Sequence, residues 1–368
     1  MGNRQKITVL GWYGKGNIGD ESYKLSFSTL FPDCDFHFTD DVKKSPSSDY
    51  LIMGGGNVID KSFFDQLDKV QVPKLLLSVG IPAHDDKRRP HLHLLDSFNQ
   101  FQHICVRDYM SFDLLQNRGI EVSYMPDFAF TLRPNKQRGK ELLRKMYRQL
   151  GGELYEHTVA VVLNSFLAVG SDLLARDFLT FQKVCFDIAR CADNTSASFI
   201  FLPFGGDQHS DDRMANSWAG GRCKWYKKNL VVYDRLGVQD TLDVMSACDV
   251  AITTRLHAAI FSTISGVPFV DITHHDKNRV YMESIGKEEW SLDYWYLDYH
   301  CLYDMVNTFL THDDAAHFRR ELLIMASINR HTLLSNVPKI LKTNTPLQGE
   351  IVVKEGAIAE VEGNRAKE

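Results

Sequence analysis

The sequence lacks the features of several specialised protein classes. None of its seven cysteines forms a CxxC pair, so their spacing indicates neither a zinc site nor a disulfide framework. No segment approaches the roughly 20 apolar residues that a membrane span needs, and the amino-terminal segment has no long apolar stretch typical of a secretion signal. We therefore expect a soluble cytoplasmic protein without a membrane span, with reduced and mostly buried cysteines.

Neither sign of charge is in large excess. Forty-two Lys and Arg against 47 Asp and Glu give a net charge of -5, which argues against a protein that coats nucleic acid, although a local basic groove is compatible with this total. A Walker lysine pattern, GxSxG and HExxH are all absent. The 368 residues, of which 44% are hydrophobic, favour two domains with substantial cores.

Apolar runs alternate with helical patterns along both halves of the chain. In the first half the expected strands are 7–14, 33–40, 49–56, 74–81, 103–108 and 122–130, and the expected helices are 21–31, 91–101 and 109–119. In the second half the expected strands are 158–166, 198–205, 230–236, 250–257 and 267–273, with helices at 177–193, 240–249 and 258–266. Because successive strands return through helices, both sheets should be mostly parallel.

These patterns predict an α/β fold of two Rossmann-like domains, residues 1–135 and 158–300, that face a central cleft. The basic and polar stretch 136–157 is the expected linker. Residues 301–342 are expected to form helices that pack back across the domains, and 343–368 a flexible tail. In open parallel sheets ligands bind outside the carboxyl ends of the strands, so the cleft is the expected site.

The stretch GKGNIG, residues 14–19, follows an expected strand and opens a helix. Free backbone N–H groups at such a point suit an anion, which makes Gly16 and Asn17 candidate substrate-binding residues. Asp20 is a further candidate for close approach to a substrate, but a carboxylate there complements the helix dipole and would repel a phosphate. A sharp turn with an acid-capped helix therefore explains the stretch equally well, and the formal GxGxxG match is a poor dinucleotide fingerprint.

The stretch GGGN, residues 54–57, also ends an expected strand. Successive glycines allow backbone conformations and close approaches that a side chain would prevent. Gly55, Gly56 and Asn57 are therefore candidate substrate-binding residues, and Asp60 is a nearby polar contact. The alternative is a tight turn at the edge of the sheet.

Cationic residues follow three other expected strands. Arg107 ends the strand HICV, Arg255 and His257 follow VAITT, and Lys277 lies beyond VPFVDIT. Arg binds carboxylate or phosphate with two parallel hydrogen bonds, and His titrates near neutrality, so the set could clamp an anion beside a proton donor. The alternatives are a structural pair between Arg107 and Asp108, and a solvated charge at Lys277.

A metal site is not expected. His274, His275 and Asp276 are adjacent, but neighbouring residues on an extended chain point in opposite directions and rarely share one ion. No cofactor is expected either.

Taken together, GNIGDE, GGGN, VRD, TTRLHAAIFSTISGVPFVDI and the following Lys277 resemble the polysaccharide pyruvyl transferase family. The motifs extend from about residue 7 to 285 in this order. The resemblance implies a fold similar to that of GT-B glycosyltransferases. It also implies transfer of a pyruvyl group from phosphoenolpyruvate to two hydroxyls of a glycan or glycan precursor, with formation of a cyclic ketal and release of phosphate.

Roles for individual residues follow from this resemblance. Phosphoenolpyruvate is a small, multiply charged anion, which Arg107, Arg255 and Lys277 could bind. His257 is the expected general acid that protonates the double bond. Asp60 could orient or deprotonate an acceptor hydroxyl.

Two alternatives remain open from the sequence. A GT-B glycosyltransferase would hold the diphosphate of a sugar nucleotide with the same cations, and its acceptor could be a glycan, a small molecule or a modified nucleic acid. An inactive binding protein of the same fold is the third hypothesis. The expected partners are otherwise a small-molecule donor and a carbohydrate acceptor, and a homo-oligomer is compatible with the sequence.

Overall fold

The structure is a computed structural model. It describes residues 4–56, 58–81, 94, 96–165, 175–207, 210–311 and 315–341. The tail predicted at 343–368 lies outside these residues. Among the helices that are described, none is long and apolar enough to cross a membrane.

The amino-terminal domain is built on a parallel six-stranded sheet. Its strands run in the order β2-β1-β3-β4-β5-β6, and their bounds are β1 Gln5–Leu10, β2 Cys34–Thr39, β3 Tyr50–Gly54, β4 Lys74–Val79, β5 His103–Val106 and β6 Ser123–Tyr124. The helices are α1 Ile18–Leu30, η1 Val42–Lys44, α2 Lys61–Leu67, α3 Tyr109–Gln116 and η3 Phe128–Thr131. The carboxyl ends of the strands lead into the segments that carry the candidate residues.

The carboxyl-terminal domain repeats this architecture. Its six-stranded parallel sheet has the order β11-β8-β7-β12-β13-β14, with β7 His157–Val162, β8 Ala197–Phe201, β11 Asn229–Val231, β12 Val250–Thr253, β13 Phe269–Thr273 and β14 Ser291–Asp293. A short antiparallel pair, β9 Gly206–Asp207 and β10 Ser210–Asp211, follows β8. The helices are α4 Lys136–Gln149, α6 Ala175–Asn194, α7 Asp212–Gly220, α8 Val238–Ala247, α9 Leu256–Ser265, α10 Asp276–Ser284, η4 Glu288–Trp290, α11 Tyr299–Thr311 and α12 Ala315–Leu341.

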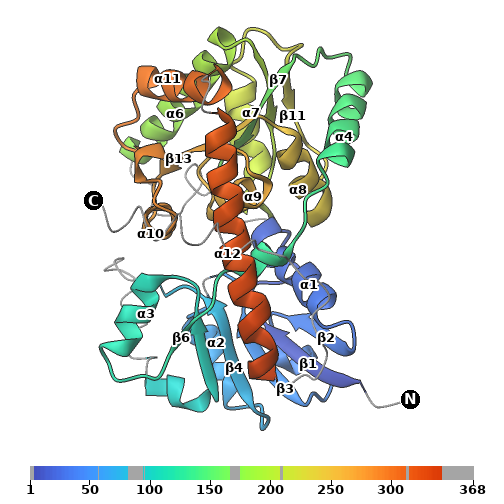
Figure 1. Cartoon of the computed structure of the whole chain (residues 1–368), viewed down its shortest axis with the longest axis vertical. Helices are drawn as coiled ribbons and strands as arrows, with labels where there is room; N and C mark the ends of the chain where they lie inside the picture. Colours follow the sequence, from blue (N-terminus) through green and yellow to red (C-terminus); the bar gives the residue numbers. More distant parts are fainter. Residues whose placement is uncertain are drawn as a thin grey trace.

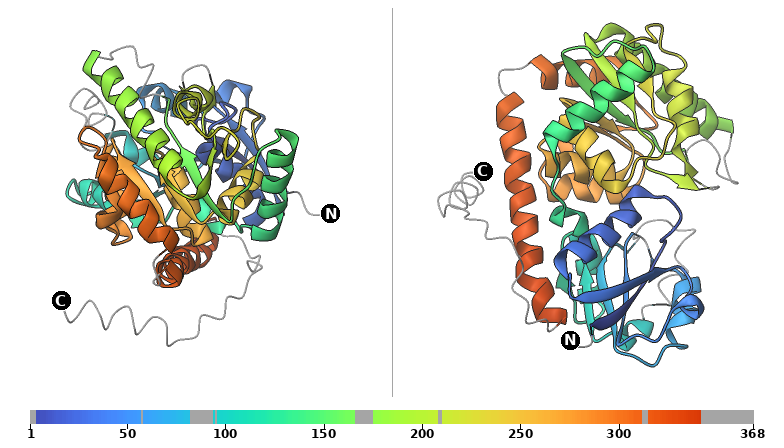
Figure 2. Two further views of the ribbon diagram at one scale, coloured as in Figure 1. Left: turned by 90° about the horizontal axis from the view of Figure 1, so that it is seen from above. Right: turned by 90° about the vertical axis from the view of Figure 1, so that its right-hand side faces the viewer.

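The two sheets confirm the predicted fold class of two Rossmann-like domains. The domains lie one above the other in Figure 1, and the long helix α12 runs along both of them. Figure 2 shows α12 on one side of the molecule, across the junction of the domains. Central strands such as β4 and β7 are buried along almost their whole length, because helices cover both faces of a parallel sheet.

Several element boundaries differ from the prediction for local reasons. The strand expected at 122–130 ends at Tyr124, because the Asp127 side chain accepts a hydrogen bond from the Ala129 N–H and begins η3. Helix α1 begins three residues earlier than expected, since Asn17 caps it. Helices α2, α7 and α10 and strand β14 were not predicted as such.

The stretch 136–157, predicted to be a linker, contains helix α4. Its buried residues Gly139, Leu143 and Tyr147 lie on one face. Gly139 allows the close contact with α8, because a Cβ there would lie 1.9 Å from the Asp243 carbonyl oxygen. The segment after the amino-terminal sheet therefore packs as part of the carboxyl-terminal domain.

Residues 301–342, predicted to form helices that cross the domains, contain α11 and α12. Helix α12 packs on α9 of one domain and on η3 of the other. Near its start, the Arg319 guanidinium donates to the carbonyl oxygen of Asp249 at 3.1 Å.

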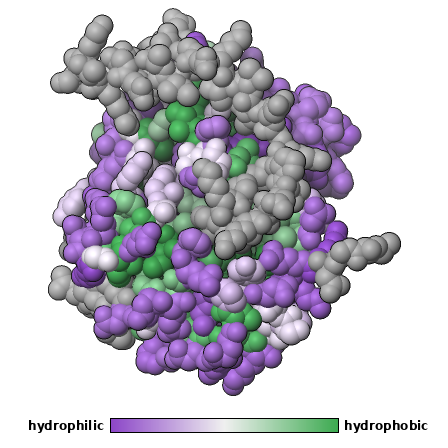
Figure 3. All heavy atoms as spheres, turned by 60° about the horizontal axis from the view of Figure 1, so that its bottom comes forward, coloured by the Kyte–Doolittle hydropathy of each residue, from purple (hydrophilic) through white to green (hydrophobic). Residues whose placement is uncertain are grey.

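Figure 3, which views the lower part of the molecule, shows a mostly hydrophilic surface with separate groups of hydrophobic side chains.

Candidate active site

A cavity of about 620 Å³ lies between the domains, at the carboxyl ends of several strands. The amino-terminal domain contributes its wall from the segments after β4, β5 and β6, and the carboxyl-terminal domain from α9 and α10. Helix α12 closes one side with Met325, Ile328, Asn329 and Thr332. The cavity therefore combines both domains, as open parallel sheets lead one to expect. Its polar and charged lining residues include Arg107, Asp108, Tyr109, Tyr124, Asp127, His274, His275, Lys277 and Tyr281.

Asp127 is the centre of the charged network at this cavity. Its Oδ2 lies 2.8 Å from an Arg107 guanidinium nitrogen and 3.3 Å from His257 Nε2. The carboxylate is almost completely buried, and burial alone would raise its pKa. The charges of His257 and Arg107 outweigh this effect and hold the pKa of Asp127 well below its usual value, so Asp127 is ionised.

A bulge in β4 helps to place this network. Ser78 has φ +55°, and the pairing of β4 with β5 shifts between Leu76 and Val79. The Tyr23 hydroxyl donates to the Ser78 carbonyl at 2.9 Å and also lies 3.3 Å from Asp127 Oδ2. The bulge thus fixes a buried tyrosine against the carboxylate.

His257 reaches this network from the other domain. It is the second residue of α9, and its side chain is 12% exposed. Its ring packs on α1, because a Cβ at Gly19 would lie 2.0 Å from His257 Nδ1. His257 does not line the cavity itself, but lies directly behind Asp127, which does.

Asp20 is a second buried carboxyl beside the same cations. Burial raises its pKa to about 6, against the opposing charges of His257, Arg107, Lys277 and Arg255. Gly56 touches it, since a Cβ there would lie 2.5 Å from Asp20 Oδ1. Asp20 and Gly56 therefore lie together at the junction of the domains, and Asp20 can exchange a proton near neutral pH.

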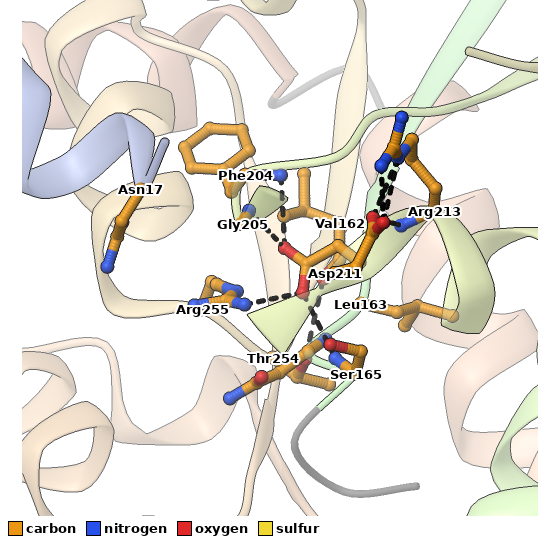
Figure 4. A network of polar contacts seen from close by, with 12 residues as sticks. Asn17, Val162, Leu163, Ser165, Phe204, Gly205, Asp211, Arg213, Thr254 and Arg255 are labelled. Atoms are coloured by element: carbon orange, nitrogen blue, oxygen red, sulfur yellow. Dashed lines mark hydrogen bonds and ion pairs between the residues drawn. The ribbon is translucent and has the colours of Figure 1, made fainter. Parts of the chain in front are cut away.

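The side chains of Arg255 and His257 contact different carboxylates. The Arg255 guanidinium pairs with Asp212, whose carboxylate also accepts the N–H groups of Phe204, Gly205 and Ser165 at 2.7 to 3.0 Å (Figure 4). Asn17, drawn in the same view, caps α1 of the other domain, and the N–H of the next residue, Ile18, donates to the Phe204 carbonyl at 2.7 Å. Arg255 and His257 therefore do not form one clamp with adjacent side chains, as the sequence suggested, although the charges of both act on Asp20.

Lys277 lies in the first turn of α10, on the cavity wall. The next residue, Asn278, donates to the buried Asp271 of β13 at 2.7 Å and so ties this turn to the sheet. His275 caps the helix and accepts from the Lys277 N–H at 3.3 Å. Burial lowers the pKa of His274, which also lines the cavity, to about 3, so its ring is neutral.

The first glycine-rich stretch uses its N–H groups within the protein. The Gly14 N–H donates to Glu21, the Gly19 N–H to Asn17, and the Ile18 N–H to the Phe204 carbonyl of the other domain. Gly16 lies against Arg235, since a Cβ there would be 3.0 Å from the guanidinium. The stretch therefore joins the two domains, and its donors at positions 14, 18 and 19 are not available to an anion.

Neither Asp60 nor Gly55 lines the cavity. Asp60 caps α2 by accepting the Ser62 N–H at 2.8 Å. Gly55 packs on Tyr13, where a Cβ would lie 2.7 Å from the hydroxyl oxygen. Asn57 lies outside the described residues. Within the described part of the chain, no group of three or more His, Cys, Asp or Glu residues could hold a metal ion.

Sequence reasoning missed Asp127, Tyr23 and the role of Asp212. Asp127 follows Pro126 shortly after the last strand, at the same sheet edge as Arg107, so the rule that identified Arg107 could have identified it. No local signal marks Tyr23, because its contact with Asp127 spans more than a hundred residues.

Comparisons with protein families and with curated proteins both find related sequences. Residues 10–276 match the family model described as polysaccharide pyruvyl transferase. The chain is 33% identical to the amylovoran biosynthesis protein AmsJ of Erwinia amylovora over 85 residues. These residues are 23% of this chain and 20% of that protein. The match thus spans about a fifth of the length of this relative.

Solved structures with the same fold include nucleotide-sugar enzymes. The S. aureus MnaA-UDP co-structure aligns with a TM-score of 0.61 and 9% identity, over 92% of this chain and 97% of that one. The UDP-GlcNAc 2-epimerase of Methanocaldococcus jannaschii, in complex with UDP-GlcNAc and UDP, aligns with a TM-score of 0.57 and 10% identity, over 89% and 99%. At such low identity these likenesses show the GT-B-like fold alone.

Proposed function

The chain belongs to the polysaccharide pyruvyl transferase family, and on that premise we propose that it transfers the pyruvyl group of phosphoenolpyruvate to two hydroxyls of a sugar. The observation that carries this proposal is the Asp127 network, in which Arg107 and His257 meet from two domains beside a cavity lined by Lys277. A small trianionic donor needs several cations around it, and this junction supplies them.

The proposed donor site uses the two cations on the cavity wall. Arg107 is held by the Asp127 carboxylate and Lys277 by the first turn of α10, so the wall is positioned before the donor arrives. We assign to them the carboxylate and phosphate of phosphoenolpyruvate. Arg255 acts from farther back, since Asp212 holds it in the carboxyl-terminal domain.

The proposed reaction needs one proton donor and one proton acceptor. A proton is added to C3 of the donor while a sugar hydroxyl bonds to C2. Loss of phosphate then leaves a cation-like C2, which the second hydroxyl attacks to close the ketal. Each of the two hydroxyls loses one proton. One of these protons restores the general acid that protonated C3, and the other leaves with the phosphate.

His257 is the proposed source of the proton. Because Asp127 lines the cavity and His257 does not, we propose that the proton reaches the donor through the Asp127 carboxylate, which lies 3.3 Å from His257 Nε2. Asp20, whose pKa is about 6, interacts electrostatically with His257 and is the proposed second proton-exchanging group of the site. Asp60 keeps its proposed role at an acceptor hydroxyl only if the acceptor extends to the start of α2, because its side chain caps that helix.

The direct test is transfer of isotope-labelled pyruvate. The protein is incubated with 13C-labelled phosphoenolpyruvate and a panel of sugar glycosides, and mass spectrometry detects labelled ketal together with released phosphate. Labelled ketal with the wild type, and none with His257→Ala, is the expected result. Glycosyl transfer from a nucleotide sugar, without any use of phosphoenolpyruvate, would instead assign the protein to the sugar-nucleotide alternative.

A further inference from the structure

Helix α4 is much more basic than the rest of the chain. Its sequence KQRGKELLRKMYRQ contains six cationic residues and one acidic residue, whereas the whole chain has a net charge of -5. The buried face of the helix, Gly139, Leu143 and Tyr147, packs towards α8. The cations therefore gather on the outward face.

Two of the six cations interact within the fold. Arg138 pairs with Asp240, and the charge of Asp249 favours that of Lys136. The other four are exposed and form no ion pair with any residue that the structure describes: Lys140, Arg144, Lys145 and Arg148. Positions 140, 144 and 148 lie in one line along the helix, and like charges at this spacing destabilise it. An anionic partner outside the chain would offset this repulsion.

Large apolar side chains are exposed where α4 ends. Leu150, Trp225 and Tyr226 are 68%, 63% and 76% exposed. The segment after α4 lies beside the segment 224–228, because the Glu153 N–H donates to the Lys227 carbonyl at 2.7 Å. We refer to the four unpaired cations of α4 together with these three apolar residues as the docking face.

We propose that the docking face binds the protein reversibly to the surface of an anionic lipid bilayer. Lys and Arg are attracted to anionic headgroups, and Trp and Tyr favour the boundary between headgroups and acyl chains. A soluble polyanion would account for the cations but not for the apolar residues beside them. A bilayer surface accounts for both, and an interfacial helix with a basic face needs no membrane span.

Docking there would leave the cavity accessible. None of the docking-face residues lines the cavity. In Figure 1, α4 lies at the opposite edge of the carboxyl-terminal domain from α10. This inference does not depend on the proposed donor, because binding to lipid can be measured without any reaction.

Vesicle sedimentation tests the proposal with the full chain. We expect binding to vesicles of phosphatidylcholine with about 30% phosphatidylglycerol, little binding to phosphatidylcholine alone, and weaker binding at high salt. Since each basic residue near such a surface contributes roughly fivefold to affinity, the quadruple variant K140Q/R144Q/K145Q/R148Q should bind at least about a hundredfold more weakly. The variant W225A/Y226A should also bind more weakly.

The control variant K43Q/K44Q/K61Q/K69Q removes the same charge from exposed positions of the other domain and should bind vesicles like the wild type. Unchanged far-ultraviolet circular dichroism and melting temperature would show that each variant is folded. Equal loss in the control variant, or wild-type binding by K140Q/R144Q/K145Q/R148Q, overturns the proposal. Undiminished vesicle binding by W225A/Y226A, with loss only on removal of charge, would indicate a general polyanion site and overturn the bilayer assignment.

Discussion

Gly19 and His257 are in direct contact across the domain junction: a Cβ at position 19 would lie 2.0 Å from the imidazole Nδ1. Opposite this contact, His257 Nε2 lies 3.3 Å from Asp127 Oδ2. The ring is therefore held between the first turn of α1 and a buried carboxylate. Its position depends on the absence of a side chain at residue 19.

The first prediction concerns Gly19→Ala. In a helix this change normally stabilises by up to about 1 kcal/mol, but here the added methyl group must displace His257. We expect a loss of pyruvyl transfer of at least about a hundredfold, in line with the loss of a positioned acid-base group. Steady-state kinetics on the purified variant measure this. Ser28→Ala, at an exposed position of the same helix, is the control and should be unaffected; equal activity in both variants would contradict the role of the contact.

Asp127→Asn tests the charge of the network with little change of shape. The amide oxygen can still accept the Ala129 N–H, so η3 should remain. Removal of one partner of a buried ion pair leaves Arg107 uncompensated, and we expect a loss of about 3 to 5 kcal/mol in the free energy of unfolding. Denaturant unfolding at neutral pH checks this expectation.

The effect of Asp127→Asn on the free energy of unfolding should depend on pH in a defined direction. The folded-state pKa of Asp127 is lowered, so its contribution to stability is present above the unfolded value near 4 and is lost as pH falls towards the folded value. The melting temperature of the wild type should therefore fall more steeply below pH 4 than that of Asp127→Asn. Parallel curves for the two proteins would show that Asp127 is not the ionised centre of the network.

The contribution of Asp20 to stability should depend on pH in the opposite direction from that of Asp127. The folded-state pKa of Asp20 is raised from 3.8 to about 6, so its stabilising contribution is complete below pH 4 and is lost as pH rises through 6. At pH 7.5 the cost is on the order of 3 kcal/mol. Asp20→Asn should thus raise the melting temperature at pH 7.5 but not at pH 4, while it lowers activity. A variant destabilised at both values would argue for a purely structural carboxylate.

Substitutions of Asp60 distinguish a helix-capping role of this residue from a catalytic role. Asp60→Ala should cost about 1 kcal/mol of stability through the loss of the α2 cap, whereas Asp60→Asn keeps the cap and should cost much less. If Asp60 acts on an acceptor hydroxyl, both variants lose turnover while their affinity for phosphoenolpyruvate is unchanged. Wild-type turnover in Asp60→Asn would limit Asp60 to capping.

The sequence was sufficient for the fold because the strands are long apolar runs separated by helical patterns. The sequence also located Arg107 and Lys277 just after strands. In the structure both residues line the cavity. The sequence could not show that His257 contacts Asp127 rather than Arg255, since that contact depends on how the two domains pack against each other. It also could not show that the Gly14–Gly19 donors are used within the protein, because one acceptor is Phe204 of the other domain.

The most direct test of the proposed donor site is calorimetric titration of phosphoenolpyruvate into the wild type, Arg107→Gln and Lys277→Gln, with UDP-sugars titrated in parallel. Because a hydrogen bond to a charged group contributes about 1.5 to 3 kcal/mol, each substitution should weaken binding by roughly 10- to 100-fold. We expect saturable binding of phosphoenolpyruvate by the wild type and this loss in both variants. Tight binding of a UDP-sugar with no heat from phosphoenolpyruvate, or equal affinity in all three proteins, would contradict the proposed donor site.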